Sequence, residues 1–196
     1  MGSEGTQRHH ALRDLVCSWV ARAGFQPEKE RPGLLLPQQP EDTGMARRRP
    51  ADIFVPSFSG KPAAFDLAVT GFQRQASLGE AGRQGGTAAT AYSALKMSHL
   101  DTASLCQQQG VSFVPLVAET TGAWVPAAAQ VLKGIVRAAA AREQVNPVGL
   151  FAEFLQEASV LVRSYRGRAA LQRRADAALA QTPSTAAATA AVVLAS

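Results

Sequence analysis

The segment RRRPADIFVPSFSGKPAAFDLAVT, residues 47–70, restricts the fold of this chain more than any other. It contains two apolar stretches, ADIFV and AAFDLAVT, on either side of the turn-forming sequence SFSG. This pattern predicts an antiparallel hairpin. Each predicted strand carries one aspartate, Asp52 or Asp66, although aspartate is depleted from strand interiors. Two charges at matched positions in a hairpin need a physical reason.

The two aspartates are predicted to face one another. If the chain turns at about Ser59, strand partners have residue numbers that add up to about 118, as those of Asp52 and Asp66 do. Directly opposite residues have Cβ atoms about 5 Å apart, and like charges there are destabilising. A divalent cation would supply the counter-charge, and Mg²⁺ prefers one or two carboxylates together with water. The pair is therefore a candidate magnesium site.

Structural explanations compete with the metal site. Asp52 could cap the start of a strand or pair with an arginine of residues 47–49, and Asp66 could pair with a buried basic residue. A slip of one residue in the hairpin would separate the carboxylates, because alternate residues of a strand point to opposite faces. The spacing leaves these alternatives open.

The rest of the sequence predicts helices around a small sheet. Apolar residues recur at helical spacing over residues 7–23, and Gly24 ends the pattern. The apolar run VSFVPLVAE is typical of a strand buried on both faces. A short strand is predicted around Gly33–Leu36, with an earlier start at Phe25 as an alternative. The other predicted segments are loops at 37–46 and 71–86, helices over 87–109 and 126–143, a helix capped by Asn146, a basic helix over 166–180, and a disordered tail from 181. This order predicts an α/β fold with a mixed sheet.

Composition narrows the class of protein. At 196 residues the chain has the size of one domain, with or without an appendage. No apolar run comes near the roughly 20 residues that span a bilayer, and a secretion signal is not evident, so no membrane partner is expected. The net charge of +5 comes mostly from arginine and favours a polyanionic partner. Cys17 and Cys106 are expected to be buried thiols in a reducing compartment.

The hairpin motifs resemble those of the PD-(D/E)xK nuclease superfamily, and more closely those of the restriction-like endonuclease domain of LINE-type retrotransposon polyproteins. In that domain an (R/K)PD-like strand is followed by a D-x-x-(V/I)-T strand, a helix with lysine and often tyrosine, and a strand ending near glutamate. The matching residues are Arg49, Pro50 and Asp52, with Ala51 inserted, then Asp66, Val69 and Thr70, then Tyr92 and Lys96, and finally Glu119. The resemblance covers roughly residues 8–125.

The resemblance implies a fold and an activity. The fold is a restriction-endonuclease-like αβββαβ core with a mixed sheet over residues 1–125, a C-terminal helical extension over 126–180, and a tail over 181–196. The activity is Mg²⁺-dependent cleavage of DNA, with Mn²⁺ as a possible substitute. A reverse transcriptase module, in the same chain or in another, is an expected partner. The expected location is intracellular, and nuclear for a retrotransposon-derived protein in a eukaryote.

The family pattern also assigns roles to residues. Asp52, Asp66 and the backbone carbonyl of Leu67 would hold the metal, and Lys96 would orient the attacking water or stabilise the transition state. Accessory roles fall to Glu30 (or Glu28), Tyr92, His99 and Glu119. DNA-backbone contacts fall to Arg47, Arg48, Arg49, Arg74 and Arg83. His9 and His10 could reach phosphate near the site, but two adjacent histidines cannot both face it, and surface exposure is expected.

One departure from the family pattern bears on catalysis. The superfamily lysine normally stands two residues after the second acid, and that position is Ala68 here. Retrotransposon members have the lysine on the following helix, which makes Lys96 the candidate. Tyr92, Lys96, His99 and Ala103 share one predicted helical stripe, which is consistent with a helix face turned toward a polar site. Lys96 could equally extend to solvent at the edge of its helix.

Two other functions compete with the endonuclease. The chain could be a catalytically inactive or domesticated nuclease fold that only binds nucleic acid, an alternative that Ala68 favours. It could also be an unrelated α/β interaction domain in which both aspartates are structural.

Overall fold

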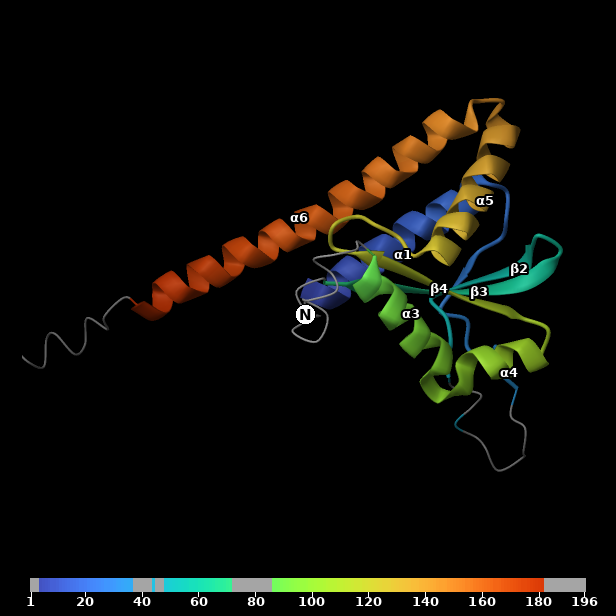
Figure 1. The fold of residues 1–196 in the computed structure, drawn as a ribbon, viewed down its shortest axis with the longest axis horizontal. Coiled ribbons are helices and arrows are strands. Elements are labelled where there is room, and N and C mark those ends of the chain that lie inside the picture. The colour runs from blue at the N-terminus through green and yellow to red at the C-terminus, as the bar shows by residue number, and fades with distance from the viewer. Residues whose placement is uncertain (1–3, 37–43, 45–47, 72–85, 182–196) are drawn as a thin grey trace, which may run out of the picture.

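The computed structural model describes residues 4–36, 44, 48–71 and 86–181 and has an α/β fold with a four-stranded mixed sheet (Figure 1). The strands lie in the order β1-β2-β3-β4, with β1, β2 and β3 antiparallel and β4 parallel to β3. The elements are α1 (Glu4–Arg22), β1 (Glu28–Lys29), β2 (Ile53–Phe58), β3 (Lys61–Thr70), α3 (Thr87–Ser98), η2 (His99–Asp101), α4 (Thr102–Gln108), β4 (Ser112–Glu119), α5 (Pro126–Glu143) and α6 (Pro147–Gln181). The predicted fold class and mixed sheet are confirmed.

The predicted hairpin and its register are confirmed. Ile53 pairs with Phe65 and Val55 with Ala63, so partner numbers add up to 118. The turn at Ser59 and Gly60 has φ of 52° and 82°, which is the positive-φ pair of a two-residue hairpin loop. A bulge between Val55 and Phe58 shifts the register by one residue. Pro56 lies in that bulge, where a residue without an N–H group costs no ladder hydrogen bond.

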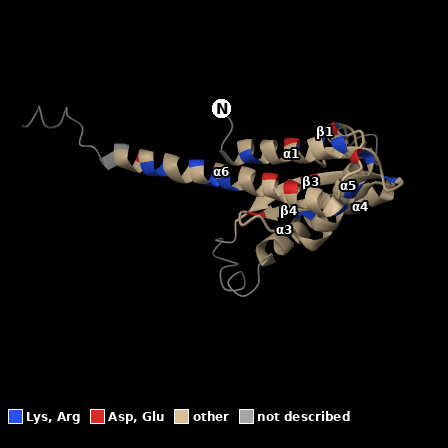
Figure 2. Cartoon of the chain, turned by 90° about the horizontal axis from the view of Figure 1, so that it is seen from above, with Lys and Arg blue, Asp and Glu red and all other residues tan. Residues whose placement is uncertain are grey.

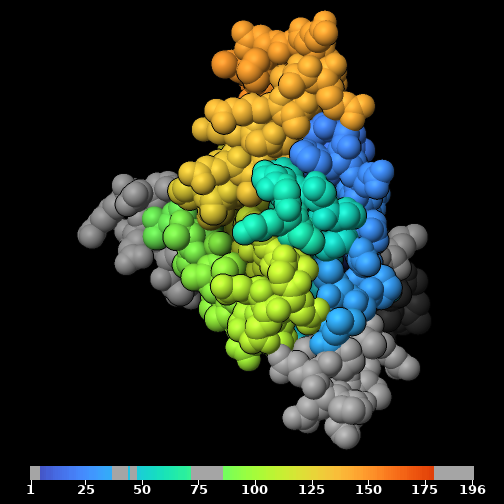
Figure 3. All heavy atoms as spheres, turned by 90° about the vertical axis from the view of Figure 1, so that its right-hand side faces the viewer, coloured from blue at the N-terminus to red at the C-terminus, as the bar shows by residue number. Residues whose placement is uncertain are grey.

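The sheet separates two layers of helices. Helices α1, α5 and α6 lie on one side, and α3 and α4 lie on the other (Figure 1). Successive side chains of a strand point alternately toward these two layers. In β3, Ala63 and Phe65 belong to the larger apolar cluster with α1, α5 and α6, whereas Ala64 belongs to a smaller cluster with Cys106 of α4. At the surface, the β2–β3 hairpin lies between α5 and α4 (Figure 3).

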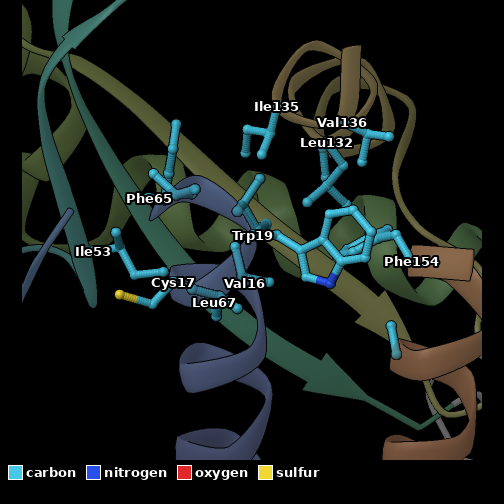
Figure 4. Packing of buried hydrophobic residues seen from close by; sticks show 14 of the residues in the cluster. Val16, Cys17, Trp19, Ile53, Phe65, Leu67, Leu132, Ile135, Val136 and Phe154 are labelled. Carbon is cyan, nitrogen blue, oxygen red and sulfur yellow. The ribbon is translucent and has the colours of Figure 1, made fainter. Parts of the chain in front are cut away.

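The larger cluster joins the N-terminal and C-terminal parts of the chain. Trp19 of α1 lies edge-on to Phe154 of α6, with ring centroids 5.6 Å apart, and both side chains pack beside Leu132 of α5 (Figure 4). The indole N–H of Trp19 donates to the carboxylate of Glu157 over 2.8 Å. The apolar core therefore continues past residue 125 into α5 and α6.

Several predicted elements are confirmed at their ends. Gly24 follows α1 with φ of 86°, a conformation that favours glycine at a helix C-terminus. Asn146 caps α6 by accepting a hydrogen bond from the Val148 N–H over 2.8 Å. The separate basic helix predicted over residues 166–180 is wrong, because α6 continues without a break as far as Gln181. The exposed Gly167 lowers local helix propensity without ending the helix.

Two other predictions differ from the structure. Residues 33–36 form no strand, and Leu34 and Leu35 instead pack in the smaller cluster. The strand of this region is β1, Glu28–Lys29, which lies within the alternative that begins at Phe25. The helix predicted over 87–109 breaks at Leu100 and Asp101, which have φ of 52° and 51°. Tertiary hydrogen bonds compensate for the break, since Arg48 donates to the Leu100 carbonyl over 3.2 Å.

Membrane insertion has no support in the described part of the chain, where no helix is both long enough and apolar enough to span a bilayer.

Phe154 offers a test of the shared core. We expect Phe154→Ala to lower the free energy of unfolding by about 3–5 kcal/mol, because the ring is fully buried against α1 and α5. Leu171→Ala on the same helix removes a side chain that is 67% exposed and should change it by less than about 0.5 kcal/mol. Urea unfolding of both variants measures the difference. Equal losses would contradict the packing of α6 on the core.

Candidate active site

Asp52 lies just before β2, and each of its carboxylate oxygens has a partner. One accepts from the backbone N–H of Leu67 on β3 over 2.7 Å, and the other lies 2.9 Å from His9 Nε2 on α1. The side chain is only 15% exposed. This carboxylate therefore joins the hairpin to α1 while lying opposite the position of Asp66.

Asp66 lies in the middle of β3 and forms an ion pair with Lys96. The ammonium group of Lys96, in the last turn of α3, lies 2.8 Å and 3.1 Å from the two carboxylate oxygens. Asp66 is 15% exposed and Lys96 25% exposed, so the pair is largely shielded from water. The structure thus brings Asp52, Asp66 and Lys96 together at one end of the hairpin.

The environment shifts the pKa values of the two carboxyl groups in opposite directions. Burial raises the pKa of Asp66 to about 6, with a contribution from Asp52, although Lys96 opposes the rise. Burial also raises the pKa of Asp52, but the hydrogen bond and charge of His9, the hydrogen bond from the Leu67 N–H and the adjoining Asp66 together outweigh it, so this pKa lies below its ordinary value. The closeness of the two carboxyl groups lowers the pKa of Asp52 and raises that of Asp66. Such a pair holds a proton preferentially on one member, here Asp66.

The two aspartates also raise the pKa values of His9 and Lys96. The hydrogen bond to Asp52 is the main reason that the pKa of His9 rises, against burial. Burial lowers the pKa of Lys96, but the hydrogen bond and charge of Asp66 outweigh it and raise this pKa. His9 and Lys96 are therefore held toward their protonated forms by the two aspartates.

Lys96 lines several hollows in the surface, and two of them bear on the site. One, of about 290 Å³, is lined by Arg48, Arg49, Asp66, Lys96 and His99 among others. The other, of about 190 Å³, is lined by Arg8, His9, Ala68, Tyr92 and Lys96 among others. Tyr92 and His99 thus lie beside the site, as do two of the predicted DNA-contacting arginines. Arg47, Arg74 and Arg83 lie outside the described residues.

Glu30 has a different set of partners. Its carboxylate pairs with Arg13 of α1 and, over 2.8 Å, with Arg49. The backbone N–H of Glu30 donates to the Asp52 carbonyl over 2.9 Å, which links β1 to the start of β2. Glu30 thus orients Arg49, and the structure does not bring its carboxylate to the Asp52–Asp66 pair. Glu28 pairs with Arg31 over 3.2 Å.

Glu119 ends β4 opposite Thr70, the last residue of β3. The side chain is 3% exposed. One carboxylate oxygen accepts from the Thr121 hydroxyl over 3.1 Å, and the other is buried without a partner among the described residues. Glu119 lies four residues further along the β3–β4 register than Asp66, and the structure does not join it to the aspartate pair.

The expectation that His9 lies at the surface is wrong. Its ring is 32% exposed and contacts Asp52, whereas His10 is exposed as predicted. The sequence did contain a signal: His9 shares a helical stripe with Leu12, Val16 and Val20, all fully buried. A histidine on a buried stripe needs a hydrogen-bond partner, and the Asp52 carboxylate is that partner.

A divalent cation fits the Asp52–Asp66 pair in one respect. Burial and the neighbouring Asp52 raise the pKa of Asp66, so the ionised form of Asp66 is disfavoured, and a bound cation would stabilise that form. Within the described residues there is no cluster of three or more side chains of the His, Cys, Asp and Glu types placed to hold a metal. Any metal here would depend on the two carboxylates, a backbone oxygen such as that of Leu67, and water.

Comparison with known protein families and with curated proteins finds no match to this chain. No relative supplies a function, so the function is inferred from the site itself.

The carboxyl titration can be measured directly. In metal-free buffer we expect ¹³C NMR of the carboxyl carbons to give a midpoint for Asp66 near pH 6 and one for Asp52 below the ordinary value. Asp52→Asn removes a group that raises the Asp66 pKa, so the midpoint should fall. Lys96→Met removes a cation that lowers it, so the midpoint should rise. The exposed Asp176→Asn is the control and should leave Asp66 unchanged; opposite shifts would contradict the described pair.

Proposed function

We propose that this chain is a metal-dependent DNA endonuclease with a restriction-endonuclease-like core. The observation that carries the proposal is the approach of the Lys96 ammonium to Asp66, which itself adjoins Asp52. Two buried carboxyl groups and a lysine are the groups that metal-assisted phosphodiester hydrolysis uses. Hollows on both sides of Lys96, with Arg48 and Arg49 lining one of them, are suited to an anionic substrate.

The chain's own residues would divide the chemistry as follows. Asp52, Asp66 and the Leu67 carbonyl would hold Mg²⁺ or Mn²⁺, which would polarise the phosphate and lower the pKa of a bound water. Lys96 would stabilise the negative charge that develops on the phosphate oxygens. His9 would hold Asp52 in its ionised form and fix its orientation through the 2.9 Å contact. Arg48 and Arg49 would bind neighbouring phosphates.

Lys96 lies where it could replace the lysine that the family pattern would have at the position of Ala68. Ala68 and Lys96 line the same hollow, so an ammonium group carried by α3 has access to the space that a lysine on β3 would use. The element order is consistent with the αβββαβ order that the resemblance implies, with η2 and α4 added between α3 and β4. These features support a nuclease whose lysine has moved from the strand to the helix.

One observation favours a second candidate, a nuclease-like fold that binds nucleic acid without cutting it. Both oxygens of Asp52 are engaged, by His9 and by the Leu67 N–H, which leaves this carboxylate less available to a metal. In this case Lys96 neutralises Asp66 permanently, and the basic residues around the hollows bind the phosphate backbone. Cleavage assays separate the two candidates.

The endonuclease proposal predicts Mg²⁺-dependent nicking of supercoiled plasmid DNA. Asp66→Asn should reduce the nicking rate by more than about a hundredfold, because loss of a ligand should exceed the 10- to 100-fold typical of outer-shell losses. EDTA should abolish nicking, and Asp176→Asn, with the same change far along α6, should not affect it. Gel analysis of relaxed plasmid measures the rate. Nicking that survives both Asp52→Asn and Asp66→Asn would exclude this site, and no nicking by the wild type would favour the non-cutting candidate.

The relocated lysine gives a sharper prediction. Lys96→Met should reduce nicking by about 10²–10³-fold, as expected for the loss of one transition-state donor. Adding Ala68→Lys to this variant should restore part of the rate, because both positions line one hollow. Lys61→Met removes an exposed lysine at the hairpin turn and serves as the control. If Lys96→Met cuts at the wild-type rate, Lys96 has only a structural role.

A further inference from the structure

A hollow of about 300 Å³ lies between α5 and α6, close to the loop that joins the two helices. It is lined by Lys133 and Arg137 of α5 and by Pro147, Val148 and Phe151 of α6. Both helices lie within the described residues 86–181. These lining residues differ from those of the hollows beside Lys96, and the corner where α5 and α6 meet lies away from α3 (Figure 1). The hollow is therefore separate from the candidate active site.

The lining of this hollow is mainly apolar, and much of it is exposed. Val148 is 76% exposed, and Val145 in the preceding loop is 46% exposed. Phe151 is partly buried, because its ring stacks on Phe154 of the core with centroids 6.2 Å apart. Single exposed apolar residues are common on protein surfaces, but here they lie at a concavity. A concave apolar surface is suited to taking up the apolar side chains of a partner.

Basic side chains add charge to this apolar surface. Lys133 and Arg137 are both exposed and follow the spacing i, i+4, which places them on one face of α5. The Lys133 ammonium group lies 5.7 Å from the centroid of the Phe151 ring. An aromatic ring attracts a cation without neutralising it, so the positive charge stays at the edge of the hollow.

The acidic residues of α5 and of the first turns of α6 bind α1. Glu143 and Glu153 pair with Arg22 over 2.6 Å and 3.2 Å. Glu157 accepts a hydrogen bond from the Trp19 indole N–H over 2.8 Å. Figure 2 shows acidic residues, in red, on the stretch of α6 that runs beside α1. The two helices thus present acidic groups to α1 and basic groups to the hollow.

A partner that matches this surface has apolar side chains together with carboxylates. A hollow between two helices is suited to a third helix, whose apolar face enters it. Lys133 and Arg137 are one turn apart, about 6 Å along α5, and carboxylates at i, i+4 on a partner helix have the same spacing. A second copy of this chain does not supply them, because the acidic residues at that spacing in its described helices, Glu153 and Glu157, already bind α1.

We propose that this hollow binds an acidic amphipathic helix of a partner protein. The apolar residues of that helix pack on Val148 and Phe151, and its carboxylates pair with Lys133 and Arg137. Burial of apolar surface supplies most of the affinity, while the ion pairs at the edge favour acidic partners over basic ones. The inference goes beyond the proposed endonuclease and does not depend on it, because the two sites share none of their described lining residues.

The test selects peptides against the immobilised full chain. A phage-displayed library of helical peptides of about 15 residues, a length at which isolated helices begin to be stable, is randomised on one face. Selected peptides should carry Asp or Glu at i, i+4 beside an apolar stripe. Fluorescence anisotropy of the fluorescein-labelled peptides then measures their Kd. Val148→Asp should raise the Kd at least about tenfold, because it brings an unpaired carboxylate into the apolar hollow.

Matched variants separate the hollow from the rest of the surface. Val160→Asp makes the same change at a 60% exposed valine of α6 outside the lining residues and should change the Kd by less than about twofold. Lys133→Glu together with Arg137→Glu should raise the Kd about tenfold or more, because like charges then face one another. Arg168→Glu together with Arg174→Glu makes the same change of charge further along α6 and should have a far smaller effect.

Three results would overturn the proposal. The first is a selection that yields only peptides without carboxylates, or none that Val148→Asp weakens while thermal unfolding shows that this variant remains folded. The second is a wild-type dimer in sedimentation that Val148→Asp makes monomeric, which would assign the hollow to a second copy. The third is binding to phosphatidylglycerol vesicles that Val148→Asp abolishes with peptide binding unchanged, which would assign this surface to a membrane.

Discussion

The β2–β3 hairpin register places two carboxyl groups side by side, and much of the surrounding structure compensates for that arrangement. One carboxylate oxygen of Asp52 accepts a hydrogen bond from the Leu67 N–H, as a backbone carbonyl would in a regular sheet. The other oxygen contacts His9. Asp66 is met by Lys96. These two cations come from α1 and α3, on opposite sides of the sheet, so the electrostatics of one pair of residues couples both helical layers. A fold without a use for the two carboxylates could avoid this requirement with two neutral residues.

Helix α3 connects this charge pair to the surface. Lys96 lies in its last turn, where a cation also interacts favourably with the helix dipole. The chain leaves the helix directly afterwards, with positive φ at Leu100 and Asp101, and this break leaves His99 beside the hollow that contains Asp66. Arg48 stabilises the break by donating to the Leu100 carbonyl. The same arginine thus supports the local backbone and contributes positive charge to the hollow.

The sequence predicted most of the sheet and its register because those depend on local patterns. The alternation in the hairpin and a turn near Ser59 were enough to pair the strands. Beside the turn, Phe58 and Lys61 have numbers that add up to 119, and the bulge between Val55 and Phe58 brings the sum to the predicted 118 further along the strands. The break after α3 had no local signal in the sequence, and a tertiary hydrogen bond to it comes from Arg48, about 50 positions away. The partner of Asp52 was open because it lies on a helix far from the hairpin in sequence. Lys96, the partner of Asp66, was a candidate for the site only through the family resemblance. Only His9 had a local signal, through its buried helical stripe.

In the endonuclease that we propose, a lysine placed on α3 instead of β3 has a mechanical consequence. A lysine on β3 would be fixed by the sheet ladder that also fixes Asp66, whereas Lys96 depends on how α3 packs against β3 and β4. Its ion pair with Asp66 offsets that freedom, because breaking the pair leaves two largely buried charges without partners. A cation that engaged Asp66 would weaken the pair and release the ammonium group toward the adjoining hollows. In a site of this design, metal binding and the availability of the lysine are linked by competition for one carboxylate.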